Sequence, residues 1–213
     1  MKYTLILGTK NWSSWSLRPY LALRHTGAEF DEVLVPLRAD TTSPEILKHS
    51  PAGRVPILKI GEHTVWDSLA ICETLNERHP DAKLWPGDPL IRATARAYAA
   101  EMHSGFADLR EQLSMDFVRR LPLPALRDAT KAQIARILEA WSEALAKHGG
   151  PDGFLFGRFS IADCMYGPVV SRFTTYGVDV PPRIAAYMAK MMALPAMRDW
   201  AEASQIEVGA GVA

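Results

Sequence analysis

The chain has 213 residues, of which 48% are hydrophobic and 23% are charged, so it can bury the core of one large domain or two modest ones. Lysine plus arginine equals aspartate plus glutamate at 24 each, which excludes an overall field that would attract nucleic acid or an anionic membrane. No segment approaches the roughly 20 apolar residues of a membrane span, and the apolar run at residues 3–7 is too short for a signal peptide. We therefore expect a cytoplasmic protein that binds neither nucleic acid nor membranes.

Residues 1–79 alternate between strand-like and helix-like patterns and predict a small α/β domain. In chain order, the expected elements are a strand at 3–7, a helix at 14–26, a strand at 30–36, strands at 55–60 and 64–66, and a helix at 68–78. Residues 79–89 hold three prolines and one glycine, which interrupt every periodic pattern around them. We place the domain linker at 80–89.

Residues 90–213 predict an all-helical domain of about five helices. Two apolar stripes recur at spacings of three and four, which defines one buried face on each of two long helices. The first stripe is Tyr98, Met102, Phe106, Leu109 and Leu113, and the second is Ile134, Ile137, Leu138, Trp141 and Leu145. The two cysteines, Cys72 and Cys164, fall inside helical patterns and form no CxxC pair, so we expect buried thiols rather than a disulfide or a zinc site.

Serines cluster where the first strand leads into the first helix. Ser13, Ser14 and Ser16 lie in the segment NWSSWSLR at 11–18. A helix N-terminus favours an anion, to which a serine hydroxyl donates a hydrogen bond. Helix capping explains the same serines equally well, because serine is a preferred N-cap residue.

The segment SPAGRVP at 50–56 leads directly into the strand of residues 57–60. Proline cannot donate to a sheet ladder, so Pro56 belongs at the start or edge of the strand, and the bond before it is a candidate cis bond. The backbone of Val55 would then be free to pair with an extended peptide. The alternative is a strand that is simply entered through a loop.

Two acid and serine pairs stand at predicted helix starts. Asp67 and Ser68 could hold the ammonium and the carboxylate of an α-amino acid group, or could simply cap the helix. Ser160 and Asp163 have the spacing of a capping box, and we assign them to folding.

Taken in order, these features resemble the glutathione transferase superfamily over essentially the whole chain. The stretch SSWSLR at 13–18 is similar to the SSCSxR motif of the zeta class, which includes maleylacetoacetate isomerases, and it departs from the motif at Trp15. The resemblance implies an α/β plus all-α architecture. In this architecture a thioredoxin-like domain at 1–79 binds glutathione, and a helical bundle at 90–213 supplies the pocket for the second substrate.

The resemblance also implies roles for single residues. Ser13, with Ser14 as runner-up, would donate a hydrogen bond to the glutathione sulfur. The other implied glutathione contacts are Trp15 beside the sulfur, Arg54 at the glycine carboxylate, Val55 and Pro56 at the cysteinyl backbone, and Asp67 and Ser68 at the γ-glutamyl group. Trp15 could instead be a packing residue, and Arg54 a solvated charge. His103 and Arg110 lie seven residues apart on one helical face, and are candidates for the second-substrate pocket or for a solvated or dimer-facing surface.

The implied activity is a glutathione-dependent transferase or isomerase, working as a homodimer on a small electrophile. A thiol with a pKa near 8.5 is mostly protonated at pH 7, so a serine donor that stabilises the thiolate would activate it. The absence of a cysteine at 11–18 argues against thiol–disulfide exchange. The alternative is a non-catalytic binding or assembly module built on the same fold.

Overall fold

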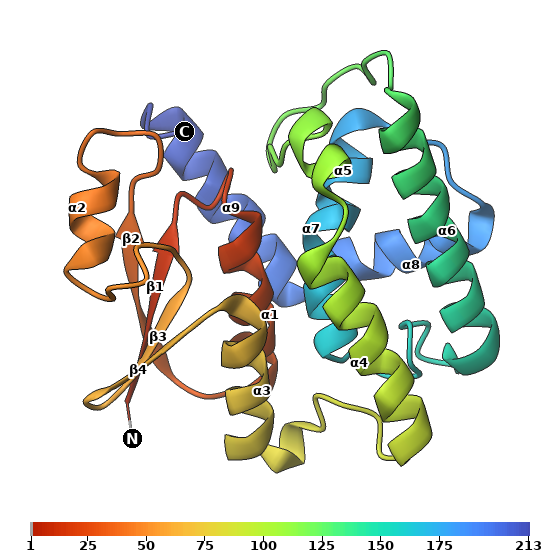
Figure 1. Cartoon of the computed structure of the whole chain (residues 1–213), viewed down its shortest axis with the longest axis horizontal. Helices are drawn as coiled ribbons and strands as arrows, with labels where there is room; N and C mark the ends of the chain where they lie inside the picture. The colour runs from red at the N-terminus through yellow and green to blue at the C-terminus, as the bar shows by residue number, and fades with distance from the viewer. Residues whose placement is uncertain (1) are drawn as a thin grey trace.

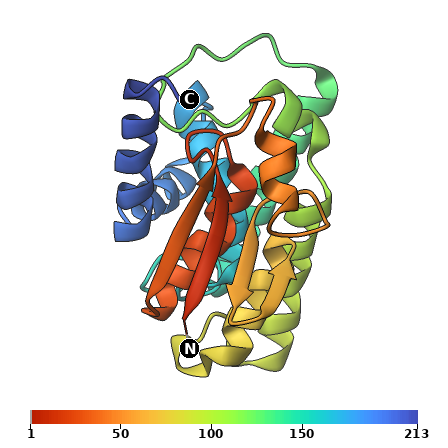
Figure 2. The same cartoon turned by 90° about the vertical axis from the view of Figure 1, so that its left-hand side faces the viewer.

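The structure, a computed structural model, describes residues 2–213 and places a four-stranded sheet beside a group of helices (Figure 1). The strands are β1 (Tyr3–Gly8), β2 (Phe30–Val35), β3 (Ile57–Ile60) and β4 (His63–Trp66), in the spatial order β2-β1-β3-β4. β1 pairs with β2 in parallel and with β3 antiparallel, and β3 pairs antiparallel with β4. The sheet is therefore mixed, and its edge strands are β2 and β4 (Figure 2).

Both faces of the central strand β1 are covered, which follows from its alternating side chains. Leu5 and Leu7 join the large core toward α1 (Ser14–Thr26) and α3 (Ser68–Arg78), whereas Ile6 joins a small core on the opposite face with α2 (Thr42–Leu47). In Figure 1 the helices α1 and α3 lie between the sheet and the group of helices on the right, whereas α2 lies on the other side of the sheet. The elements predicted for residues 1–79 are confirmed, except that β3 begins at Ile57 and that α2 was not predicted.

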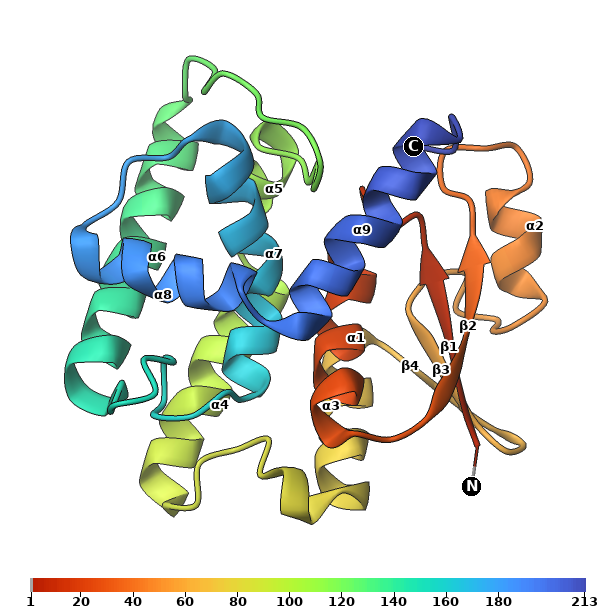
Figure 3. The ribbon, with the colours of Figure 1, turned by 180° about the vertical axis from the view of Figure 1, so that it is seen from behind.

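The helical part begins after the 3-10 turn η1 (Pro80–Ala82). Its members in the described chain are α4 (Pro89–Ser104), α5 (Ala107–Gln112), α6 (Asp128–His148), α7 (Ile161–Tyr176), α8 (Pro182–Met192) and α9 (Pro195–Gly209). The last helix, α9, leaves this group and lies beside α1, ending near the top of the sheet (Figure 3). The division at 80–89 stays a prediction, because the large core runs without interruption from β1 to Trp200.

The apolar stripe from Tyr98 to Leu113 is not one helix, so the prediction of a single long helix is wrong. The chain breaks at Gly105 and Phe106, where Phe106 takes a left-handed conformation with φ of 62°. The guanidinium of Arg110 donates to the carbonyls of Met102 and Gly105. A side chain of α5 therefore satisfies carbonyl groups that the end of α4 leaves unpaired.

The predicted capping box is confirmed at the start of α7. The buried carboxylate of Asp163 accepts the Ser160 N–H and hydroxyl, each at 2.9 Å, and the Leu155 N–H at 3.2 Å. Cys72 and Cys164 are both buried and unpaired, as expected. No helix within residues 2–213 is long and apolar enough to cross a membrane.

Candidate functional site

A pocket of about 370 Å³ opens beside the junction of β3, β4 and the starts of α1 and α3. Three segments far apart in sequence meet there, and Leu37 and Ile46 add apolar wall. Six of the eight residues expected to contact glutathione line it, namely Trp15, Arg54, Val55, Pro56, Asp67 and Ser68, whereas Ser13 and Ser14 do not. The candidate serines Ser13 and Ser14 directly precede Trp15 and are themselves 4% and 5% exposed.

The serine loop shows two different uses of its hydroxyl groups. Ser13 is the N-cap of α1, since its oxygen accepts from the Ser16 N–H at 3.4 Å and its hydroxyl donates to the Ser16 Oγ at 2.7 Å. The Ser16 Oγ also accepts from the Gly8 N–H at 3.1 Å, which ties the cap to the end of β1. Within residues 2–213 the Ser14 hydroxyl has no hydrogen-bond partner. The cap therefore occupies Ser13 and leaves the Ser14 hydroxyl available to a ligand.

The approach to β3 presents unpaired backbone to the pocket. The Val55–Pro56 peptide bond is cis, and Pro56 is buried. In the part of the chain that the structure describes, neither the N–H nor the C=O of Val55 has a hydrogen-bond partner. Arg54, next to it, is exposed and has no ion pair among these residues. An extended ligand could thus pair with Val55 and place a carboxylate at Arg54.

Asp67 and Ser68 open α3 in an unusual backbone conformation. Asp67 has φ of 73°, a value that residues other than glycine seldom adopt. Its Oδ1 caps the helix by accepting from the Leu69 N–H at 2.8 Å and the Ala70 N–H at 3.4 Å. The Ser68 hydroxyl is buried and has no hydrogen-bond partner within residues 2–213. Since a buried hydroxyl is rarely left unpaired, Ser68 is a candidate ligand contact, whereas Asp67 already caps the helix.

His103 of α4 connects Asp67 to Trp15. Its Nε2 lies 3.2 Å from the Asp67 Oδ2, and its ring meets the Trp15 ring edge-on with 5.4 Å between centroids. Burial and the nearby cations Arg18 and Arg110 lower the pKa of His103 below 6.5, although Asp67 opposes the shift. His103 is therefore neutral at pH 7 and reaches the pocket through Asp67 and Trp15.

Arginines surround the indole of Trp15. The Arg110 Cζ lies 4.7 Å and the Arg18 Cζ 4.2 Å from the ring centroid. His103 and Arg110 thus meet at one tryptophan, although they belong to two helices rather than to one face of a single helix. Burial lowers the pKa of Arg110 to about 10. Trp15 is 37% exposed and lines the pocket, so it both packs and contacts the site.

Arg18 is the residue that sequence reasoning missed. It is fully buried, and no hydrogen bond reaches any of its three guanidinium nitrogens from residues 2–213. Burial, then Arg110 and Arg172, hold the pKa of Arg18 well below its usual value. Two sequence signals were available, namely the arginine that ends the SSWSLR stretch at 13–18 and its place inside the otherwise apolar helix stretch at 17–23. A buried cation without an ion pair is costly, and the contact that the structure gives its guanidinium is the face of the Trp15 ring.

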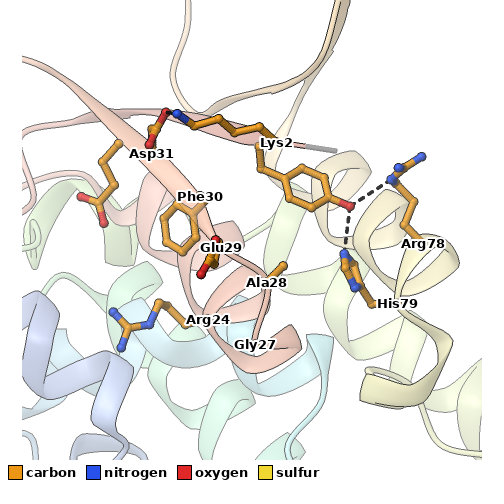
Figure 4. A pocket seen from close by; sticks show the side chains of 11 residues that line it. Lys2, Arg24, Gly27, Ala28, Glu29, Phe30, Asp31, Arg78 and His79 are labelled. Atoms are coloured by element: carbon orange, nitrogen blue, oxygen red, sulfur yellow. Dashed lines mark hydrogen bonds and ion pairs between the residues drawn. The ribbon is translucent and has the colours of Figure 1, made fainter.

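A second, larger hollow of about 1300 Å³ lies elsewhere, near the first residues of β1 and the ends of α1 and α3 (Figure 4). There the Tyr3 hydroxyl hydrogen-bonds the His79 Nε2 at 2.8 Å and accepts from the Arg78 Nε at 3.0 Å. None of the residues predicted to carry chemistry lines this hollow. Its size alone therefore does not make it the functional site.

Comparison with known protein families gives two matches along the chain. Residues 12–78 match the family model described as glutathione S-transferase, N-terminal domain, and residues 124–203 match glutathione S-transferase, C-terminal domain. Maleylacetoacetate isomerase of Pseudomonas aeruginosa is 30% identical over 207 residues, covering 92% of this chain and 94% of the relative. A probable maleylacetoacetate isomerase of Caenorhabditis elegans is 28% identical over 189 residues, covering 82% and 87%.

Solved structures agree with these matches. A sphingomonad glutathione S-transferase complexed with glutathione superposes with a TM-score of 0.67 at 25% identity, covering 95% of this chain and 99% of the other. The expected architecture, a thioredoxin-like domain followed by a helical bundle, is thereby confirmed.

Proposed function

The chain belongs to the glutathione S-transferase family, and we propose that it is a glutathione-dependent transferase or isomerase acting on a small anionic electrophile. The observation that carries the proposal is the 370 Å³ pocket, in which six residues expected to contact glutathione converge from three separate segments of the sequence. The groups of Val55 and Ser68 that have no partner within residues 2–213, and the exposed guanidinium of Arg54, fit a tripeptide. Asp67 and Ser68 would hold its γ-glutamyl end, Val55 its cysteinyl backbone and Arg54 its glycine carboxylate.

The sulfur of glutathione would lie at the start of α1, against Ser13 and Ser14. Two physical effects favour a thiolate there: the positive end of the helix and a serine hydroxyl. A hydrogen bond to a charged group contributes about 1.5–3 kcal/mol, so one serine donor would lower the thiol pKa by about one to two units. The thiolate would then attack an electrophilic carbon, with conjugation or adduct-mediated isomerisation as the outcome.

Buried positive charge supports an anionic second substrate. Arg18 and Arg110 flank Trp15. The buried Arg172 lowers the pKa of Arg18 by charge repulsion, so the presence of a third cation nearby is costly. Asp67 is the carboxylate that opposes this charge, and it already caps α3 and pairs with His103. A substrate carboxylate would supply the missing negative charge.

A homodimer remains part of the proposal. Large apolar side chains are exposed at Trp66, which is 49% exposed, and at Leu90, which is 80% exposed. Light scattering coupled to size-exclusion chromatography would measure the mass in solution.

The decisive experiment is calorimetric titration of glutathione into the wild type, Arg54→Ala and the control Arg198→Ala, which removes an exposed arginine of α9. We expect Arg54→Ala to weaken binding about tenfold and the control to leave it unchanged. Turnover would then be compared for cis-dienoic keto acids and for their neutral esters, with the acids preferred. No binding to the wild type at millimolar glutathione would overturn the enzyme proposal and favour the non-catalytic module.

A further inference from the structure

The loop that carries the serines is held by hydrogen bonds from the helical part of the protein. Lys10 and Asn11 lie between β1 and α1, only three and two residues before Ser13. The C=O of Lys10 accepts from the Trp200 Nε1 at 2.9 Å, and the C=O of Asn11 accepts from the Phe117 N–H at 3.1 Å. The backbone carbonyls of this dipeptide are therefore both held by groups from the C-terminal half of the chain.

Glu207 of α9 holds the two N–H groups of the same dipeptide. Its Oε1 accepts from the Lys10 N–H at 2.9 Å and its Oε2 from the Asn11 N–H at 3.0 Å. The residue is only 7% exposed, so both oxygens of a buried carboxylate are used on consecutive backbone donors nearly 200 positions away. In Figure 3 α9 starts beside α1 and ends near the top of the sheet. Such charge-assisted hydrogen bonds are among the stronger ones in proteins.

The Asn11 side chain forms further hydrogen bonds with the segment between α5 and α6. Its Oδ1 accepts from the Val118 N–H at 3.0 Å, and its Nδ2 donates to the Asp116 Oδ1 at 3.3 Å. Asp116 is itself buried and is paired with Arg119 at 2.5 Å. Partners beyond residue 115 thus hold all four backbone polar groups of Lys10 and Asn11. They also hold both polar atoms of the Asn11 side chain.

The held dipeptide continues directly into the serine cap. The Trp12 and Ser13 N–H groups both donate to the Thr9 C=O, at 3.1 and 2.8 Å, so the turn to Ser13 is rigid once Lys10 and Asn11 are fixed. We propose that Glu207 is a positioning residue for the glutathione thiolate, because it fixes the loop that places the serine hydroxyls at the start of α1. This inference rests on the proposed function of the serines. It makes the C-terminal helix α9, which does not line the glutathione pocket, a determinant of thiol activation.

The test compares Glu207→Gln with Glu202→Gln, which removes an exposed carboxylate from the same helix. Glutamine keeps the volume of Glu207 but presents one acceptor and one donor to two N–H groups. We expect the pKa of bound glutathione, followed by thiolate absorbance against pH, to rise by about one unit, so that kcat/KM below pH 7 falls about tenfold. Glutathione affinity of the fully protonated thiol should change less than about threefold, because Val55, Ser68 and Arg54 are untouched.

A purely structural role for Glu207 would lower the melting temperature while leaving the thiol pKa at the wild-type value, and that outcome overturns the inference. Asn11→Ala provides an independent variant, because it loosens the same loop from the other side and should raise the thiol pKa in the same direction. Failure of the proposed function is distinguishable, since in that case Ser13→Ala and Ser14→Ala would also leave the thiol pKa unchanged.

Discussion

Replacing Ser13 and Ser14 separately should distinguish activation of the glutathione thiol from capping of α1. Without a donor, a cysteine thiol has a pKa of about 8.5 and is about 3% ionised at pH 7. One hydrogen bond of about 1.5–3 kcal/mol brings roughly 30–80% of it to the thiolate. Because the Ser13 hydroxyl donates to Ser16 while that of Ser14 has no partner among the described residues, we expect Ser14→Ala to raise the pKa of the bound thiol by about one to two units.

Ser13→Ala should instead act on stability. It removes the N-cap of α1 and leaves the buried Ser16 N–H without an acceptor, which costs about 1 kcal/mol and lowers the melting temperature by about 2–4 °C. The assay is thiolate absorbance of the glutathione complex against pH, with thermal unfolding measured in parallel. If Ser13→Ala raised the thiol pKa and Ser14→Ala did not, the Ser13–Ser16 hydrogen bond would have to break on binding, and our assignment of the free hydroxyl would be refuted.

Four further outcomes follow from the site and its supports. Ser68→Ala should weaken glutathione binding about tenfold with little loss of stability, measured by calorimetry, because the hydroxyl it removes has no partner within residues 2–213. Arg18→Met should leave the protein equally or more stable, by up to about 4 kcal/mol in chemical unfolding, while turnover of anionic electrophiles falls. Burial lowers the pKa of His103, so its contribution to the free energy of unfolding is fully present above pH 6.5 and is lost as the pH falls through the lowered pKa of the folded state. In His103→Asn, the free energy of unfolding measured in urea should therefore depend less on pH over that acidic range. Asp163→Asn should destabilise the protein by about 1–3 kcal/mol in the same assay, because an amide oxygen cannot accept all the hydrogen bonds that the buried carboxylate accepts.

Local sequence rules predicted the parts of the site that depend on local geometry. The position of Pro56 before an apolar run indicated a strand entry with free backbone, and Val55 is unpaired there among residues 2–213. The acid and serine pair at 67–68 indicated a helix start, and Asp67 caps α3. Such features follow from backbone donors that a helix or strand leaves unpaired within a few residues, so the sequence contains most of what determines them.

The rest of the site depends on contacts between distant segments. Nothing near Glu207 in the sequence indicates that its carboxylate meets Lys10 and Asn11, because α9 is an ordinary amphipathic helix until it is docked on α1. The break between α4 and α5 at Phe106 could not be predicted from the sequence for a similar reason. The apolar spacing continues through it, and the cause of the break, the left-handed Phe106 with Arg110 on the α4 carbonyls, is visible only in three dimensions.

The sheet side and the helical part of the chain contribute different groups to the glutathione site, so neither part alone would both bind glutathione and activate its sulfur. Val55, Asp67 and Ser68, from the sheet side, offer the groups that would hold a tripeptide, and they need little from the helices beyond the His103 contact to Asp67. The start of α1 is different, because its approach is fixed by Glu207 from one side, and its Trp15 is flanked by Arg110 from the other. Binding of glutathione should therefore tolerate loosening of the helical part, whereas activation of its sulfur should not. Mild urea, below the global unfolding transition, should raise the pKa of the bound thiol before it releases glutathione.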